Sequence, residues 1–353
     1  MSDACPEFRT PENFLPENSP VENKLISLRN AVARYTHDGL QLATNGLPVG
    51  SEPSAFAREL VRQGRKNLHI VSACTSSAIN LLCGVGAVAK MEGGFSGLEV
   101  LGFANGVRRA VESGSAVWED YSNLAMPLRY LAGALNLPFF PTNVCIGSDI
   151  QHRNCDEPGV YPSRTKIPEI TDPFTGKKLG ALRALRPELA VIHVPLADIS
   201  GNAIMLGTEW SRWELSRAAQ RVIIVADRIV DPACIRQFPN LVRIPALFVS
   251  AVVPFPFAAW PNCSVGFYEI DVEHYRALNE ALKTEAGTRE YVEKFILPVE
   301  TPQQFLEMLG EEKIAQLSAT PTAFLADPYR KWILPADEVE ALLAESPQNA
   351  EKL

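Results

Sequence analysis

Residues 189–194 read Leu-Ala-Val-Ile-His-Val, and residues 222–226 read Val-Ile-Ile-Val-Ala. Both runs are almost wholly apolar and rich in β-branched residues, which is typical of strands buried on both faces of a sheet. Further strands are predicted at 40–44, 68–73, 87–90, 116–118, 139–145 and 246–253. Helical segments separate most of these runs. The alternation predicts an α/β fold of three layers, with helices on both sides of a largely parallel central sheet.

The helical segments are recognised by apolar residues that recur on one face. In residues 25–35 this face holds Leu25, Leu28, Val32 and Tyr35. Other helices are expected at 54–63, 124–135, 272–283, 288–295, 302–309 and 312–317.

The chain is expected to have three parts. Residues 1–21 contain four prolines and no apolar period, which predicts an irregular N-terminal tail. Residues 22–318 are expected to form the α/β domain, and 319–353 a C-terminal tail. The stretch at about 148–180 is rich in Pro, Gly and charged residues. It predicts a long excursion, which in a compact domain is usually functional or forms an interface.

Composition and charge exclude several classes of function. The 353 residues are 46% hydrophobic and 21% charged, as expected of a chain that folds into a globular domain. A net charge of −8 and an isoelectric point near 5.3 argue against nucleic-acid binding, which needs clustered Lys and Arg. Neither a secretory leader nor a membrane span is indicated. We therefore expect a cytoplasmic protein that binds no nucleic acid and no membrane.

The cysteines and the missing motifs argue against a bound metal or cofactor. The seven cysteines are scattered, without a Cys-x-x-Cys pair or a His at metal-ligand spacing. Cys74 and Cys83 could be nucleophiles, but their apolar surroundings favour core thiols. The sequence also lacks the glycine-rich loops of dinucleotide and nucleotide-phosphate sites, the zinc helix motif and the nucleophile elbow.

One strand-to-helix junction has two interpretations. Residues 118–123 read Trp-Glu-Asp-Tyr-Ser-Asn, between a predicted strand and a predicted helix. In a parallel sheet flanked by helices, such junctions are where ligands bind. On local chemistry alone the favoured interpretation is structural: Ser122 or Asn123 caps the helix, and Glu119 and Asp120 favour its positive end.

The string Gly50-Ser51-Glu52-Pro53 contains a candidate carboxylate nucleophile. Glu52 precedes a proline at a helix start, however, and a glutamate there is usually a partner of the helix dipole.

Residues 252–261 combine three prolines with aromatic side chains. They predict a rigid apolar loop at a strand end, which either lines a pocket or covers the sheet edge.

Several strings in the same order, over about residues 23–317, resemble the α subunit of a family I coenzyme A transferase of the glutaconate type. They are Asn23–Leu28, Thr36–Gly39, Glu59–Gly64, Trp118–Asn123, Leu137–Pro141, Asp172–Gly176, Val191–Val194, Gly201–Ala203, Ala218–Val222, Ile244–Pro245, Ala251–Val253 and Lys283–Glu285.

The resemblance implies a three-layer, Rossmann-like coenzyme A transferase fold and an enzyme of two kinds of subunit. The active site would lie between the α and β chains, and an α2β2 heterotetramer is the default. A glutamate of the β subunit would attack the acyl-CoA and carry CoA to an acceptor carboxylic acid. This chain would hold no permanent cofactor and no metal, with the coenzyme A thioester as substrate.

The resemblance also implies site residues. Asn123 stands where the family has a Gln amide, so it is expected to donate a hydrogen bond to the oxyanion, with Ser122 as the expected helix cap. Substrate-binding positions are expected at Ser122, Gly46, Ser51, Glu52, Ser76, Ser77, Phe95 and Trp260.

Departures from the family pattern concern the acyl group. Glu52 replaces a basic residue, Trp260 replaces a histidine, and residues 74–78 (Cys-Thr-Ser-Ser-Ala) replace a glycine-rich stretch. All three changes suggest an acyl group that is larger or less anionic than glutaconate.

Three other functions are alternatives. The first is a subunit of an acyl-CoA or ring-opening hydrolase on the same scaffold, and the second is a non-catalytic subunit that binds acyl-CoA or supports the β chain. A sugar-phosphate isomerase or regulator is more distant, because the phosphate-binding loops are missing.

Overall fold

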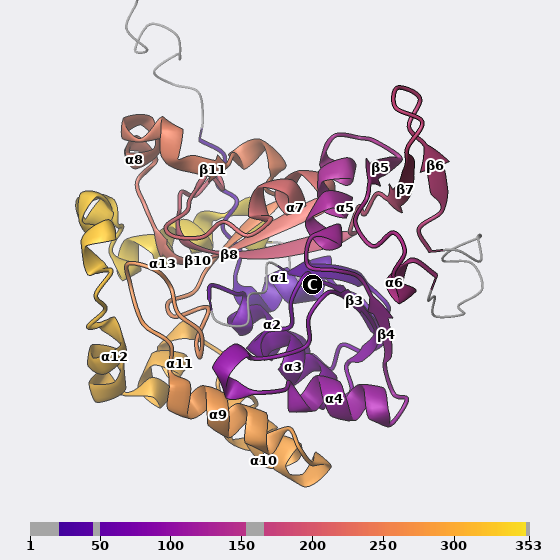
Figure 1. The fold of residues 1–353 in the computed structure, drawn as a ribbon. Coiled ribbons are helices and arrows are strands. Elements are labelled where there is room, and N and C mark those ends of the chain that lie inside the picture. Colours follow the sequence, from indigo (N-terminus) through magenta and orange to yellow (C-terminus); the bar gives the residue numbers. More distant parts are fainter. Residues whose placement is uncertain (1–20, 45–49, 153–165, 351–353) are drawn as a thin grey trace, which may run out of the picture.

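The computed structural model describes residues 21–44, 50–152 and 166–350. A nine-stranded sheet forms its centre (Figure 1). Seven strands are parallel, in the order β12-β10-β8-β1-β2-β3-β4. Their bounds are β12 Ala251–Pro254, β10 Arg221–Ile229, β8 Leu189–Ala197, β1 Gln41–Thr44, β2 Leu68–Val71, β3 Val88–Gly93 and β4 Val117–Asp120. Every residue of β8 is buried, as the apolar run predicts.

Helices cover both faces of this sheet (Figure 1). On one face, the first helices pack over a core that includes Phe56, Leu60 and Ile79; they are α1 Leu28–Tyr35, α2 Ser54–Arg62, α3 Ser77–Gly84 and α4 Asn105–Glu112. On the other face, α5 Ala125–Ala134 and α7 Arg212–Ala218 cover a second core that includes Tyr130 and Leu215. The predicted three-layer α/β fold with a largely parallel sheet is confirmed.

The second half of the chain adds a helical region, whose first helix packs against α3 and α4 (Figure 1). Its helices are α9 Val272–Ala281, α10 Glu285–Phe295, α11 Pro302–Leu309 and α12 Glu311–Ser318. Two short helices, α6 Asp149–His152 and α8 Pro232–Gln237, lie in connections. In the described ranges, no helix is both long and apolar enough to cross a membrane.

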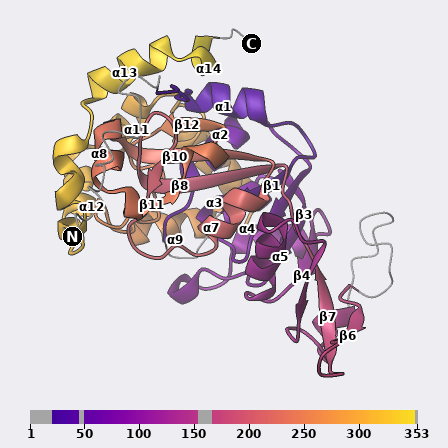
Figure 2. The ribbon, with the colours of Figure 1, turned by 90° about the horizontal axis from the view of Figure 1, so that it is seen from above.

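The segment after residue 318 belongs to the packed structure and is not a separate tail. It contains α13 Ala336–Glu345 and α14 Pro347–Ala350, which lie beside α1 (Figure 2). Ile333 pairs with Val230 in an isolated antiparallel bridge. The side-chain amide of Asn23 donates to the Leu342 carbonyl at 2.7 Å. The domain therefore extends through residue 350, while the predicted tail at 1–21 lies almost wholly outside the described residues.

The strand predicted at 139–145 is shorter and sits elsewhere. It is β5 Phe139–Thr142, which pairs with β7 Lys178–Arg183 in a separate antiparallel sheet that also contains β6 Glu169–Thr171. This small sheet projects away from the central sheet (Figure 2). Pro141 has no N–H to donate, and the mostly exposed pattern of β5 suits an edge position. The predicted excursion thus contributes its own sheet, although residues 153–165 lie outside the described ranges.

Two further strands were not predicted. β9 Ala203–Ile204 pairs antiparallel with the end of β8, and β11 Val242–Ile244 pairs with β9. The strand predicted at 246–253 starts late, because Ala246–Phe248 form a 3-10 turn before β12.

Candidate active site

Several of the predicted site residues lie at the carboxyl ends of the central parallel strands. β1 ends at Thr44, Ser72–Ser76 follow β2, Gly94 follows β3 and Tyr121–Asn123 follow β4. In open α/β sheets, ligands bind outside this edge. The side-chain hydroxyls of Thr44 and Thr75 are buried here without a hydrogen-bond partner in the described residues. Since buried hydroxyls are normally paired, the hydrogen-bonding capacity of these two is available to a polar group of a ligand.

Asn123 is exposed at this edge, with its amide oriented by a cysteine. The Cys74 thiol lies 3.6 Å from Asn123 Oδ1 and donates to it. Within the described residues, the Nδ2 group forms no hydrogen bond, so its N–H groups are available to a ligand. Burial, with a smaller contribution from Glu99, raises the pKa of Cys74 to about 11, so the thiol keeps its proton at neutral pH. Cys74 is therefore a donor that positions Asn123 and not a thiolate nucleophile.

A glycine allows the β4–α5 turn to approach the end of β3. A Cβ atom on Gly94 would lie 2.5 Å from the backbone nitrogen of Asn123 and 2.6 Å from its Oδ1. No side chain fits in that space. The absence of a Cβ at Gly94 thus places Asn123 beside Cys74.

The other residues of 118–123 have structural partners. Ser122 Oγ accepts a hydrogen bond from the N–H of Ala125, the first residue of α5, at 3.0 Å, although the N-cap position itself is Leu124. Glu119 is buried and pairs with Lys166 at 2.7 Å. Tyr121 lies below the guanidinium of Arg129, 4.0 Å from ring centroid to Cζ. At this junction Ser122 therefore pairs with the first N–H of α5, and Asn123 is exposed.

Glu52 is fully buried and acts on a different helix from the one expected. Its carboxylate accepts from the N–H of Ala78 at 2.9 Å and from the hydroxyls of Ser54, at 2.9 Å, and Ser77. These contacts place it at the N-terminus of α3, where the helix dipole favours negative charge. Burial nevertheless raises its pKa above the ordinary value. The structure thus favours the dipole-partner interpretation of Glu52 over that of a nucleophile.

The remaining predicted positions are divided between this edge and the interior. Phe95 is 37% exposed and forms an isolated bridge with Cys74, so it lies at the same opening as Asn123. Ser76 and Ser77 are buried at the start of α3. Gly46 lies outside the described residues.

Trp260 is not brought into this opening. It is 2% exposed, and its ring lies 3.9 Å from that of His274, centroid to centroid, and 5.6 Å from that of Phe305. Its indole N–H donates to Asp271 at 3.1 Å, and its carbonyl accepts from Arg58 at 2.8 Å. The side chain fills the core between α2 and the C-terminal helices, so we do not include it in the candidate site.

A second polar constellation was missed by the sequence analysis. Ser51 Oγ lies 2.6 Å from His193 Nδ1, and His193 Nε2 lies 2.9 Å from Asp227 Oδ2. The available signal was a histidine inside the apolar run that forms β8 and an aspartate directly after the run at 222–226. Pairing them requires the register of β8 against β10, which places Val225 opposite His193.

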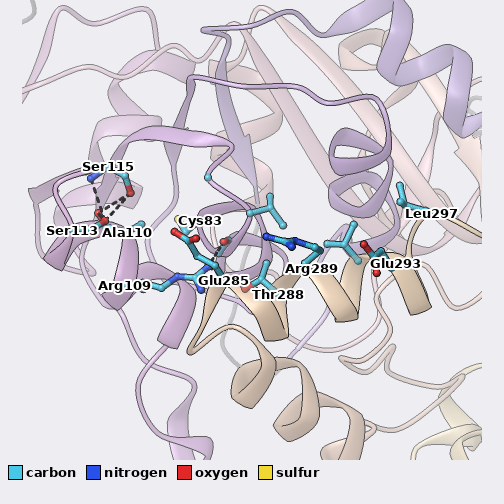
Figure 3. A pocket seen from close by; sticks show the side chains of 14 residues that line it. Cys83, Arg109, Ala110, Ser113, Ser115, Glu285, Thr288, Arg289, Glu293 and Leu297 are labelled. Atoms are coloured by element: carbon cyan, nitrogen blue, oxygen red, sulfur yellow. Dashed lines mark hydrogen bonds between the residues drawn. The ribbon is translucent and has the colours of Figure 1, made fainter.

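A cavity of about 660 Å³ lies apart from these residues, between α3, α4 and α10 (Figure 3). Arg109 and Arg289 line it, together with Glu285 and Glu293. None of the predicted site residues lines this cavity. In the described residues, no group of His, Cys, Asp and Glu is arranged to hold a metal ion.

The sequence comparisons define the class. A family model described as Coenzyme A transferase matches residues 25–254. The chain therefore belongs to the coenzyme A transferase family. It is 30% identical to the A subunit of 3-oxoadipate CoA-transferase from Pseudomonas knackmussii, over 82% of this chain and 99% of that protein. It is 26% identical to the A subunit of glutaconate CoA-transferase from Acidaminococcus fermentans, over 85% and 96%. Within the family, it is an α-type chain of the family I enzymes.

Two other relatives are an uncharacterised protein and a subunit of a hydrolase. An uncharacterised Archaeoglobus fulgidus protein is 34% identical over 83% of this chain, but the match spans only 64% of that protein. A cholesterol ring-cleaving hydrolase subunit of Mycobacterium tuberculosis is 25% identical over 80% of this chain and 97% of its own length.

Solved structures share the fold. The crystal structure of glutaconate coenzyme A-transferase from Acidaminococcus fermentans superimposes with a TM-score of 0.78 at 23% identity, over 89% of this chain and 99% of that chain. A variant of the decarboxylase AibA/AibB superimposes with a TM-score of 0.65 at 28% identity, over 76% and 96%.

Proposed function

We propose that this chain is the α subunit of an enzyme that moves CoA between an acyl-CoA and a carboxylic acid. The nucleophilic glutamate would come from a β subunit, in a cytoplasmic α2β2 complex. Two relatives are named as one subunit of a CoA-transferase, which supports a partner chain. The acyl-CoA and the acceptor acid are the substrates, and the chain itself needs no permanent cofactor.

The observation that carries the proposal is the amide of Asn123. It is exposed at the carboxyl edge, Cys74 orients its oxygen, and its Nδ2 group is available as a donor. When a carboxylate attacks a thioester, negative charge develops on the carbonyl oxygen. A preorganised amide donor stabilises that charge by on the order of 3 kcal/mol. Asn123 would thus stabilise the transition states on either side of an enzyme-bound thioester.

The carboxylates near this edge explain why a nucleophile from a partner is needed. Glu52 is buried against α3, and Glu119 is buried against Lys166. Neither carboxylate is open to a substrate in these positions. A second subunit that faces the same edge would supply the missing group.

The acyl chain that we propose is larger or less anionic than glutaconate. Glu52 replaces a basic residue of the resembled pattern and is itself buried against α3, so this position supplies no cation for a second carboxylate of the substrate. Phe95 adds apolar surface beside Cys74. Both features disfavour a second carboxylate near this opening.

Hydrolysis is the second candidate function, because a ring-cleaving hydrolase subunit matches most of the chain. Co-expression with a β-type subunit separates the candidates. Purified complex would be given a panel of acyl-CoAs, with and without an added carboxylic acid, and the fate of CoA followed by mass spectrometry. CoA on the added acid supports transfer. No CoA on the added acid, with free CoA released at the same rate with and without it, contradicts transfer, and no reaction across the panel would favour a non-catalytic, acyl-CoA-binding subunit.

A further inference from the structure

Ser51, His193 and Asp227 come from three different elements and form one chain of hydrogen bonds. Ser51 is half-buried ahead of α2, whereas His193 in β8 and Asp227 in β10 are fully buried. The register places Val225 opposite His193, and Asp227 follows two residues later. Alternate residues of a strand face the same side, so both side chains point to the sheet face that carries α2.

The partners of Asp227 fix the direction of these hydrogen bonds. Its Oδ1 accepts from the Tyr268 hydroxyl and from the N–H of Ala258, each at 2.9 Å. Burial alone would raise the pKa of Asp227, but its interaction with His193 brings it below its ordinary value, and the Tyr268 and Ala258 donors also favour the ionised carboxylate. An ionised carboxylate only accepts, so His193 Nε2 carries the proton toward it. In the neutral imidazole, Nδ1 then accepts the hydroxyl proton of Ser51.

Arg212 places a positive charge at the same residue. Its guanidinium is buried and donates to the Ser51 carbonyl at 3.2 Å. Burial lowers the pKa of Arg212 to about 10, so it is still charged at neutral pH. Within the described part of the chain, its Nε atom has no hydrogen-bond partner. A buried cation with an unused donor favours an anionic group, or a developing negative charge, beside Ser51.

We propose that Ser51 is a nucleophile, with His193 as its base, and that this chain hydrolyses acyl thioesters through an acyl-serine intermediate. This activity goes beyond CoA transfer and needs neither the β subunit nor an acceptor acid. Asp227 is a positioning residue that holds the proton on His193 Nε2. The two ring nitrogens are exchanged relative to the common Ser-His-Asp arrangement, but either nitrogen of imidazole can accept while the other donates.

The reaction balances in two steps. Ser51 Oγ attacks the thioester carbonyl carbon, its proton passes to His193 Nδ1, and the carbon–sulfur bond breaks as this proton goes to the leaving CoA thiolate. Water then attacks the serine ester, giving one proton to His193 Nδ1. The carbon–oxygen bond to Ser51 breaks, and this proton returns to Ser51 Oγ. The products are a carboxylic acid and free CoA thiol.

The test uses the purified full chain without a partner. It is treated with a fluorophosphonate probe, the labelled residue is mapped by peptide mass spectrometry, and thiol release from hexanoyl-CoA is followed with a thiol-reactive dye. We expect a label on Ser51, its loss in Ser51→Ala, and acceptor-independent thiol release that falls in parallel. Ser115→Ala, a substitution of an exposed serine on the α4–β4 connection, is the matched control and should behave as wild type.

Asp227→Asn keeps the shape of the side chain. It tests whether Asp227 sets the tautomer of His193 or only stabilises the fold. An amide that donates to His193 Nε2 forces the proton onto Nδ1, and such a change of tautomer lowers the rate by on the order of 10⁴-fold. Circular dichroism and thermal melting check that this variant is folded. No label on wild-type Ser51, or equal labelling of folded Asp227→Asn, would overturn the proposal. A failure of CoA transfer in the complex would leave this result unaffected, because no β subunit is present.

Discussion

The opening around Asn123 and the aromatic cluster around Trp260 both contain positions that the resemblance assigns to the active site, Asn123 as the oxyanion donor and Trp260 as a substrate-binding residue. At the opening, Asn123 is exposed and Cys74 orients its amide. In the cluster, Trp260 is enclosed by Arg58, His274 and Phe305. A shared sequence position therefore does not give a shared role. Burial and free hydrogen-bonding groups decide which side chain can reach a ligand.

The largest effect is expected from Trp260→Ala, and it should fall on stability. Removing a fully buried indole leaves a cavity and costs about 3–5 kcal/mol of unfolding free energy. The measurement is chemical denaturation of the purified chain. Trp213→Ala is the matched control, because Trp213 is 37% exposed on α7 and its ring stacks with the Arg217 guanidinium, and it should cost less stability than Trp260→Ala. Normal stability of Trp260→Ala combined with a raised KM would return Trp260 to the substrate site.

Asn123→Ala should act on catalysis instead of stability. Loss of one oxyanion donor lowers kcat by about 100-fold to 1,000-fold, and KM should change little because the interaction strengthens in the transition state. The assay is CoA transfer by the complex with a β subunit. Asn123→Gln, which restores an amide, should recover part of the rate. Full activity of Asn123→Ala would remove this residue from the mechanism.

The pH dependence of stability tests how far the aromatic cluster around Trp260 shields His274 from water. Burial lowers the pKa of His274 from 6.5 to about 4, despite the opposing charge of Asp271. Above pH 6.5 the side chain is neutral in both folded and unfolded chains and adds no pH dependence. As the pH falls from 6.5 to 4, the unfolded chain binds the proton first, so up to about 3 kcal/mol of stability is lost. Denaturation at several pH values should show a shallower fall for His274→Gln.

Ser122→Ala should give the smallest effect, confined to the end of α5. The substitution removes the hydrogen bond to the N–H of Ala125 and should cost about 1 kcal/mol of stability. Thermal melting measures this cost, and CoA transfer should fall less than in Asn123→Ala. A larger catalytic loss at Ser122 than at Asn123 would reverse the roles of these two neighbours.

The sequence was sufficient for the sheet because β8 and β10 are continuous apolar runs with no competing pattern. It was misleading at β5, where an apolar run with Pro141 forms an exposed antiparallel strand instead of a buried parallel one. Short pairings such as β9 with β11 carry too few residues to show a period.

In the site, too, features encoded locally in the sequence were predictable, and contacts between distant segments were not. Residues 118–123 could be found because a strand-to-helix junction is local in sequence. The contact of Ser51 with His193 joins residues 142 apart, and that of His193 with Asp227 joins residues 34 apart. Both depend on strand register and loop path, which no local pattern encodes. The burial of Trp260 was also not predictable from the sequence, because this residue lies in an aromatic loop and is covered by α9 and α11 only in the folded chain.

Gly94 limits how this protein can evolve. Because the Asn123 backbone occupies the space of any Cβ there, a variant library at position 94 should return glycine almost exclusively among active clones. Position 123 would accept other amide or polar side chains without disturbing its neighbour. Lineages that change the reaction can therefore replace the side chain at 123 in one step, while the glycine that sets its location is inherited unchanged.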